Sequence, residues 1–330
     1  MKKYAFYVVL MLILTAMTAG VALAAAPKYP ERDITIIGPW SPGSGTDTIG
    51  RVVAQYASEK WGVPVNVINK VGAYGISGVQ ELAEAKPDGY TLGTSCQADA
   101  QVMYAIFGDN LPFTKDQRTY IVKLSELRFI AAVSVEQNIK TFEELMEFAR
   151  TDPSFRWSGG SVTGLTGFAI AYLLNEAGVK DINAKRVNFE GGGMDATAAM
   201  AGGHLTTYFI SETEYKTYCA GDKPLLRPLA VVGDQRLKTA PDLPTTKELG
   251  YQCTLKGWYG ITGPANIPDY VYTAWEKLVE EGREELEKRY QKAGITFTYL
   301  PHKEFTAEGD KMYNDVVKLI SELGLEFDVD

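Results

Sequence analysis

The stretch of residues 33–60 constrains the fold of this chain more than any other. A short apolar run at 34–37 leads into a glycine-rich polar loop at 38–47, followed by a segment whose apolar residues recur every three or four positions. This order predicts a strand, a loop and a helix, with Thr46 or Asp47 as the helix N-cap. A helix N-terminus presents unpaired N–H groups and about half a positive charge, so the loop is suited to an anion. The alternative is a plain strand-to-helix connection without a ligand.

The same plan returns along the chain. We expect strands at residues 63–69, 90–94, 129–134, 155–158, 186–189, 205–210 and 228–232. Most of them end in loops rich in glycine and hydroxyl side chains, which is typical of open parallel sheets that bind ligands beyond the carboxyl ends of their strands. The glycine spacing at 72–78 fits neither a dinucleotide fingerprint nor a Walker loop, so nucleotide binding is disfavoured.

The C-terminal third has a different pattern. Residues 242–251 suggest a connector with a short helix, and residues 258–264 are apolar and rich in turn formers. Two helices are expected after them, at 270–293 and 305–323. The charged residues of the first of these helices are most simply a solvated outer face.

The first 26 residues have the pattern of a secretory signal peptide. Lys2 and Lys3 precede an apolar run, and small residues at 21–26 offer cleavage sites. An uncleaved membrane anchor is the alternative. Because no cysteine lies near the cleavage point, a lipid anchor is not expected, and a freely soluble exported protein fits best in a periplasm.

Composition excludes some partners. The formal net charge is −8, and no stretch gathers the basic residues that nucleic-acid binding requires. Three cysteines (Cys96, Cys219, Cys253) allow at most one disulfide, so small hydrophobic thiols are the simpler interpretation.

The chain offers little for catalysis. It has only two histidines, His204 and His302, and neither has a partner at motif spacing. Asp47 and Asp195 are candidates for an acid/base pair, but helix capping explains both more simply. We therefore predict no catalytic residue, no metal site and no cofactor. Neutral N–H and O–H donors at several strand ends instead favour binding of a carboxylate without turnover.

An ordered set of motifs runs along nearly all of the predicted mature chain. The motifs are Pro-Trp-Ser-Pro-Gly-Ser-Gly-Thr-Asp at 39–47, Asn-Lys-Val-Gly-Ala-Tyr-Gly at 69–75 with Gly78, Pro-Asp-Gly-Tyr-Thr-Leu at 87–92, Gly-Gly-Gly at 191–193, Arg-Pro-Leu-Ala-Val at 227–231, Pro-Asp-Leu-Pro-Thr at 241–245, Glu-Leu-Gly-Tyr at 248–251, and Trp-Tyr-Gly-Ile at 258–261 with Pro264. No single motif is specific, but the set, in this order, resembles the solute receptors of tripartite tricarboxylate transporters, also called Bug receptors.

The resemblance implies a two-lobed α/β fold of the periplasmic-binding-protein or Venus flytrap type. Each lobe would be a sheet flanked by helices, with the ligand cleft between the lobes. Lobe 1 would comprise residues 27–129 plus 253–330, and lobe 2 residues 130–252. A monomeric receptor would close by hinge motion on a di- or tricarboxylate, an aromatic carboxylate or an acidic amino acid, and deliver it to inner-membrane transporter subunits.

The resemblance also implies the ligand-binding positions. In lobe 1 they are Trp40, Ser41, Gly43, Ser44, Gly45, Thr46, Asp47, Ala73, Tyr74, Thr94 and Gln97. In lobe 2 they are Ser158, Gly159, Ser161, Thr163, Gly164, Gly191, Gly192, Gly193, Asp195 and Ser211.

The sequence departs from the family pattern at three places. Gly167 and Phe168 stand where a histidine is common, Glu190 replaces a basic residue, and Ser44 interrupts a run of glycines. Glu190 is either an acceptor for a ligand hydroxyl or amine or an exposed turn residue. Two other functions stay open: a carboxylate sensor that signals to a membrane kinase, and an exported α/β enzyme.

Overall fold

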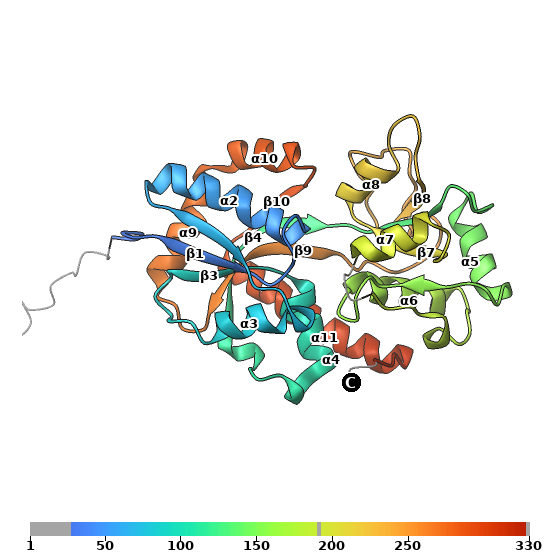
Figure 1. Cartoon of the computed structure of the whole chain (residues 1–330), viewed down its shortest axis with the longest axis horizontal. Helices are drawn as coiled ribbons and strands as arrows, with labels where there is room; N and C mark the ends of the chain where they lie inside the picture. The colour runs from blue at the N-terminus through green and yellow to red at the C-terminus, as the bar shows by residue number, and fades with distance from the viewer. Residues whose placement is uncertain (1–27, 190–192, 328–330) are drawn as a thin grey trace, which may run out of the picture.

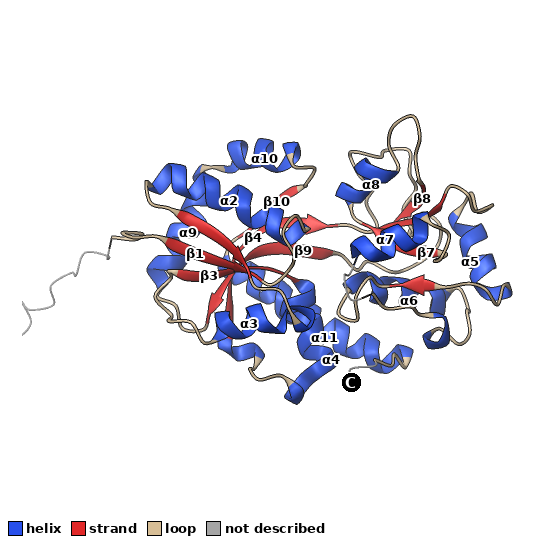
Figure 2. Ribbon diagram, in the orientation of Figure 1, coloured by secondary structure: helices blue, strands red, loops and turns tan. Residues whose placement is uncertain are grey.

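The computed structural model describes residues 28–189 and 193–327. It consists of two α/β lobes side by side along the long axis of the molecule, each with a sheet covered by helices (Figures 1 and 2). The predicted signal peptide lies outside the described residues.

The larger sheet has six strands in the order β10-β4-β9-β3-β1-β2. Their bounds are β1 Ile34–Gly38, β2 Val65–Asn69, β3 Thr91–Cys96, β4 Arg118–Leu127, β9 Gly257–Pro264 and β10 Phe297–Leu300. β1 pairs in parallel with β2 and β3, but β9 runs antiparallel to β3 and β4, and β10 runs antiparallel to β4. The sheet is therefore mixed, and the prediction of a parallel sheet is correct only for its first three strands.

The smaller sheet has four strands in the order β6-β7-β5-β8. They are β5 Ile130–Ser134, β6 Trp157–Ser158, β7 Thr207–Ile210 and β8 Leu226–Val231. β6 is parallel to β7, whereas β5 is antiparallel to both β7 and β8. The strand expected at 186–189 is wrong: in this segment only Arg186 forms a β-bridge, to Trp157.

Helices pack on both sheets. They are α2 Gly45–Trp61, α3 Ile76–Ala83, α4 Met103–Phe107, α5 Phe142–Thr151, α6 Leu165–Glu176, α7 Gly193–Ala201, α8 Glu212–Tyr218, α9 Asp269–Glu281, α10 Arg283–Lys292 and α11 His302–Leu323, with a π-helical turn at Ala98–Val102 before α4 and short 3₁₀ turns at Ala73–Gly75, Gly108–Asn110, Lys115–Gln117 and Asn183–Lys185. Thr141 is the N-cap of α5, and Gly62, in the left-handed conformation, ends α2.

Two predictions for the C-terminal third are wrong, and one strand is not predicted. The segment at 258–264, whose sequence indicates only an apolar stretch rich in turn formers, is the central strand β9. The connector at 242–251 forms turns without a helix. The helix expected at 270–293 is divided at Gly282 into α9 and α10. At Gly282 a Cβ atom would lie 2.3 Å from Tyr56 Oη, so the helix pair changes direction where α2 packs closely against it.

Two connections join the sheets, one between β4 and β5 and one between β8 and β9. Near both connections, the rings of Trp258 and Phe305 pack edge to face with centroids 4.7 Å apart. α11 packs on β4 with its N-terminal part and extends beneath α6 of the other lobe, where Phe168 stacks with Phe327 (Figure 1). The C-terminal helix therefore contacts both lobes.

Candidate functional site

A cavity of about 460 Å³ lies between the lobes and is lined by residues of both. Its size is within the range of small-molecule pockets, about 300–1,000 Å³. One wall is the loop before α2, and the opposite wall consists of the loop before α6 and the first turns of α7 and α8. The segments joining β4 to β5 and α10 to β10 close one side.

The N-terminus of α2 points at this cavity. Its N-cap is Ser44, whose Oγ accepts from the N–H of Asp47 at 3.3 Å, so the prediction of Thr46 or Asp47 as the cap is wrong by two or three residues. Gly45 and Thr46 occupy the first two helical positions and line the cavity. Their N–H groups have no acceptor one turn earlier within the helix, so they are available to an anion.

Asp47 supports the loop from behind. Its carboxylate accepts from Gly43 N at 2.9 Å, Asn69 Nδ2 at 2.9 Å and Arg51 Nε at 2.9 Å. Asn69 also donates to the carbonyl of Trp40 at 2.9 Å. Burial raises the pKa of Asp47, but the hydrogen bonds from Arg51, Gly43 and Asn69 outweigh it and hold that pKa below its usual range. Asp47 therefore shapes the loop and does not line the cavity.

Each lobe places a tyrosine hydroxyl against a glycine in the first turn of a helix. A Cβ atom at Gly45 of α2 would lie 2.4 Å from Tyr259 Oη, and one at Gly193 of α7 would lie 2.4 Å from Tyr208 Oη. The two tyrosines come from β9 and β7, one in each sheet, and both line the cavity. Burial raises the pKa of both hydroxyls, so each is a neutral donor at physiological pH.

The loop before α6 is folded tightly on itself. A Cβ at Gly164 would lie 1.9 Å from the carbonyl oxygen of Gly159, so no side chain fits there. Thr166 Oγ1 donates to the same Gly159 oxygen at 2.7 Å and fixes the first turn of α6. Ser161, at the tip, faces the cavity.

Behind Trp40 lies a buried polar cluster around Asp99. Asp99 Oδ1 accepts from Trp40 Nε1 at 3.1 Å and from Cys96 N at 2.9 Å. Its other oxygen pairs with Arg118 at 3.2 Å, and the Asp99 side chain is fully buried. This cluster fixes the position of Trp40 at the cavity wall.

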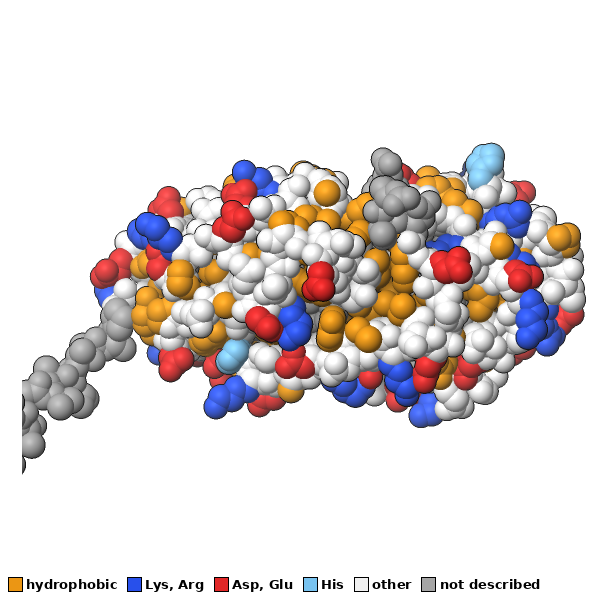
Figure 3. All heavy atoms as spheres, turned by 90° about the horizontal axis from the view of Figure 1, so that it is seen from below, with side chains coloured by type: hydrophobic (Ala, Val, Ile, Leu, Met, Phe, Trp, Pro, Cys, Tyr) orange, Lys and Arg blue, Asp and Glu red, His pale blue; other side chains and the backbone are white. Residues whose placement is uncertain are grey.

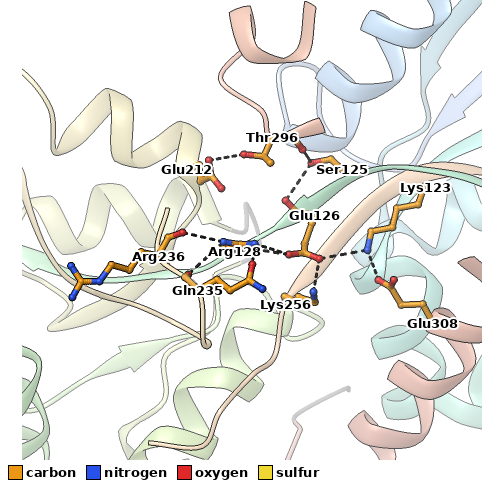
Figure 4. Close-up of polar contacts among 10 residues, drawn as sticks. All are labelled: Lys123, Ser125, Glu126, Arg128, Glu212, Gln235, Arg236, Lys256, Thr296 and Glu308. Carbon is orange, nitrogen blue, oxygen red and sulfur yellow. Dashed lines mark hydrogen bonds and ion pairs between the residues drawn. The ribbon is translucent and has the colours of Figure 1, made fainter. Parts of the chain in front are cut away.

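Charged contacts surround the connection between β4 and β5 (Figure 4). Glu126, at the end of β4, pairs with Lys256 at 2.5 Å on the return connection and with Arg128 at 3.2 Å between β4 and β5. Arg128 also donates to Gln235 Oε1 of the second lobe at 2.9 Å. Lys123 pairs with Glu308 of α11 at 2.5 Å.

The cavity carries negative rather than positive side chains. Among the described residues that line it there is no lysine, arginine or histidine, but there are three glutamates: Glu126, Glu212 and Glu214. On the face shown in Figure 3, basic and acidic side chains are interspersed, and hydrophobic atoms gather near its middle. Any anion in the cavity must therefore be held by neutral donors.

The structure brings most of the predicted positions to the cavity. These are Trp40, Ser41, Gly43, Ser44, Gly45, Thr46, Gln97, Gly159, Ser161, Gly164, Gly193 and Ser211. Gly191, Gly192 and Glu190 lie outside the described residues.

Other predicted positions lie away from the cavity: Asp47, Ala73, Tyr74, Thr94, Ser158, Thr163 and Asp195. Thr94 donates to the carbonyl of Thr46 at 2.9 Å beneath α2, and Ser158 Oγ accepts from Gly160 N at 3.0 Å. Thr163 is buried, whereas Asp195 is exposed on α7.

Sequence reasoning missed Tyr208, Tyr259, Thr166 and the three glutamates. Both tyrosines lie on strands, and their approach to a glycine of a distant helix has no local signal. Glu214 is the exception, because the Ser-x-x-Glu spacing with Ser211 is the signature of a capping box, which the structure contains.

The described residues contain no group of three or more histidine, cysteine, aspartate or glutamate side chains placed to hold a metal ion. They also include no helix long and apolar enough to span a membrane. All three cysteines are free thiols, and burial raises the pKa of Cys219 and Cys253 to about 12.

Residues 49–288 match the family model described as "Tripartite tricarboxylate transporter family receptor". The chain is 30% identical over 287 residues to the "UPF0065 protein in gbd 5'region" of Cupriavidus necator, covering 81% of this chain and 82% of that protein.

Two solved structures share the fold. The periplasmic binding protein BugD superposes with a TM-score of 0.77 at 21% identity, covering 90% of this chain and 99% of that one. R. palustris Rpa4515 with adipate superposes with a TM-score of 0.81 at 18% identity, with the same coverage. The fold is therefore the two-lobed periplasmic-binding-protein type that the sequence predicts.

Proposed function

Because the chain belongs to the family of tripartite tricarboxylate transporter receptors, we propose that it captures a small organic carboxylate between its lobes and delivers it to an inner-membrane transporter. Residues 1–26 are the signal peptide that directs it to the periplasm. The receptor works as a monomer and releases its ligand unchanged.

The observation that carries this proposal is the pair of facing seats in the cavity. Each seat combines the first turn of a helix with a tyrosine hydroxyl: α2 with Tyr259 and α7 with Tyr208. Both supply neutral donors, which hold a carboxylate without a fixed counter-charge and release it readily. A dicarboxylate spans such a pair, and the adipate in the Rpa4515 structure is a dicarboxylate.

The two connections between the sheets act as the hinge about which the lobes close. Lobe 1 comprises residues 27–129 and 253–330, lobe 2 comprises residues 130–252, and the lobes rotate about these connections. Closing brings the seats together and removes water from the carboxylate, which strengthens each hydrogen bond.

The test removes one hydroxyl at a time. Tyr208→Phe and Tyr259→Phe should each raise the Kd for a dicarboxylate by about tenfold or more, since a hydrogen bond to a charged group contributes about 1.5–3 kcal/mol. Isothermal titration of the mature protein against succinate, glutarate, adipate, citrate, benzoate, aspartate and glutamate measures the effect.

Tyr104→Phe is the matched control. Tyr104 Oη is also buried, has no hydrogen-bond partner among the described residues, and lies outside the cavity. This variant should bind with unchanged affinity. Absence of binding to every carboxylate by the wild-type protein would contradict the proposed function.

A further inference from the structure

The three glutamates of the cavity differ in their partners. Glu126 is neutralised by Lys256 and Arg128, as described above. Glu214 accepts from Ser211 N at 2.8 Å, Ser211 Oγ at 2.7 Å and Thr197 Oγ1 at 2.7 Å. Both carboxylates are therefore satisfied by the protein itself.

Glu212 has one polar contact among the described residues. Its Oε2 accepts from Thr296 Oγ1 at 3.0 Å, across the cavity from α8 to the segment before β10 (Figure 4). No basic side chain described in the structure lies within 4 Å of it. Lys216, one turn further along α8, is exposed, and Arg128 is held by Glu126 and Gln235.

The side chain of Glu212 is also largely buried. Its relative exposure is 8%. Burial raises the pKa of its carboxyl group and outweighs the hydrogen bond from Thr296 and the more distant charges of Arg128 and Lys216, which lower that pKa. A buried carboxylate without a counter-charge is costly unless a donor or a cation meets it. Glu212 also lines the cavity, so a bound ligand can supply the donor or cation that its carboxylate lacks.

We propose that the ligand carries an ammonium group in addition to its carboxylate, and that Glu212 accepts a hydrogen bond from this ammonium. The inference rests on the proposed function, because the carboxylate occupies the seats described above. A ligand of this kind supplies the positive charge that the described cavity residues lack. Glu212 is then a specificity-determining residue that favours amino acids over simple dicarboxylates.

The opposite arrangement is a neutral, protonated Glu212 that donates to a second ligand carboxylate. It predicts a preference for the plain dicarboxylate and little effect of Glu212→Gln, because an amide also donates. The two arrangements therefore give opposite results with matched ligands.

The experiment compares succinate with aspartate and glutarate with glutamate by isothermal titration at pH 7. Each pair differs only by the ammonium group. The wild-type protein should bind the amino analogue at least about tenfold more tightly, and Glu212→Gln should reduce this ratio by about tenfold or more. Thr296→Val removes the contact across the cavity but keeps the carboxylate, so it should weaken both ligands of a pair alike and preserve the ratio.

Lys216→Gln is the control for a general charge effect, because it alters the charge on the same helix without touching the cavity. It should leave the ratio within about twofold. Equal or tighter binding of the plain dicarboxylates by the wild-type protein, or an unchanged ratio in Glu212→Gln, would overturn the inference and leave the carboxylate receptor intact. Failure of all four ligands to bind, with other carboxylates binding, would also overturn it, whereas failure of every carboxylate would overturn the proposed function itself.

Discussion

Asp99 is a single residue on which several parts of the cavity wall depend. It holds Trp40 and the backbone of Cys96, and it is the buried partner of Arg118. Asp99→Asn leaves Arg118 without its counter-charge, and breaking a buried pair typically costs about 3–5 kcal/mol. We expect a loss of this order in the free energy of unfolding, measured by denaturant titration at pH 7.

The neighbouring pair of Lys115 and Asp116 is the control for this prediction. Its atoms are 2.8 Å apart, but both side chains are at least half exposed. An exposed pair contributes about 0–1 kcal/mol, so Asp116→Asn should have little effect. Similar small losses in the two variants would show that Asp99 and Arg118 do not form a stabilising pair.

At this scale the sequence predicted several of the loops that line the cavity, although the predicted loop with Ala73 and Tyr74 does not reach it, and it did not predict which way the side chains point. Trp40, Gly45 and Ser211 lie at the cavity as expected. Asp47 and Thr94 are in the predicted segments, but each satisfies a backbone group behind the loop. The direction of a short polar side chain depends on which buried donor or acceptor needs a partner, and that partner is distant in the sequence.

At the scale of elements, the N-caps of α2 and α5 offer a matched pair. Ser44 Oγ and Thr141 Oγ1 each accept from the N–H three residues later, at 3.3 and 3.2 Å. Ser44→Ala and Thr141→Ala should therefore each lower the free energy of unfolding by about 1 kcal/mol. Only Ser44 lies at the cavity, so only Ser44→Ala should also weaken carboxylate binding, by several-fold in titration. An equal affinity in the two variants would argue that the N-terminus of α2 is not a carboxylate seat.

The elements that sequence reasoning found are those with local signals. β1 and α2 have the apolar pattern and the neighbouring glycines from which a strand and a helix are expected. The sequence of β4 has no such pattern, and that of β9 indicates only an apolar stretch rich in turn formers. β4 contains Lys123, which is almost fully buried because Glu308 of α11 pairs with it. β9 contains Gly260, where a Cβ would lie 2.5 Å from Val122 O, so glycine is required in the middle of the strand. In the sequence alone, a lysine indicates a surface segment and a glycine indicates a turn, because the residues that contact them are distant in the chain.

At the scale of the whole molecule, the ordered motifs predicted the two lobes. They did not predict that α11 contacts both of them. This helix was assigned to the first lobe, yet it packs on β4 and also on α6. Its apolar residues fit either lobe, and only the packing of Phe305 on Trp258 and of the helix on α6 shows that it contacts both. Any closing motion must therefore pivot near α11 as well as at the two connections.

The ion pairs of Glu126 should make the free energy of unfolding dependent on pH. Burial raises the pKa of Glu126, but the hydrogen bond from Lys256 and the charges of Lys256, Lys123 and Arg128 outweigh it and hold that pKa below its usual range. A carboxyl group with a lowered folded-state pKa stabilises the protein above its unfolded-state pKa, about 4.3, and this contribution is lost as the pH falls through the folded-state pKa.

We therefore expect Glu126→Gln to lower the free energy of unfolding by about 2 kcal/mol at pH 7, because it removes charge-assisted bonds to both connections. The difference from the wild-type protein should shrink as the pH falls below about 4, since protonation then removes the same bonds from the wild type. Denaturant titrations at pH 7 and at two acidic values measure it. Glu59→Gln, which removes an exposed partner of Arg289, should show a much smaller difference. A difference for Glu126→Gln that stays constant or grows on acidification would mean that Glu126 stabilises the connections by packing rather than by charge.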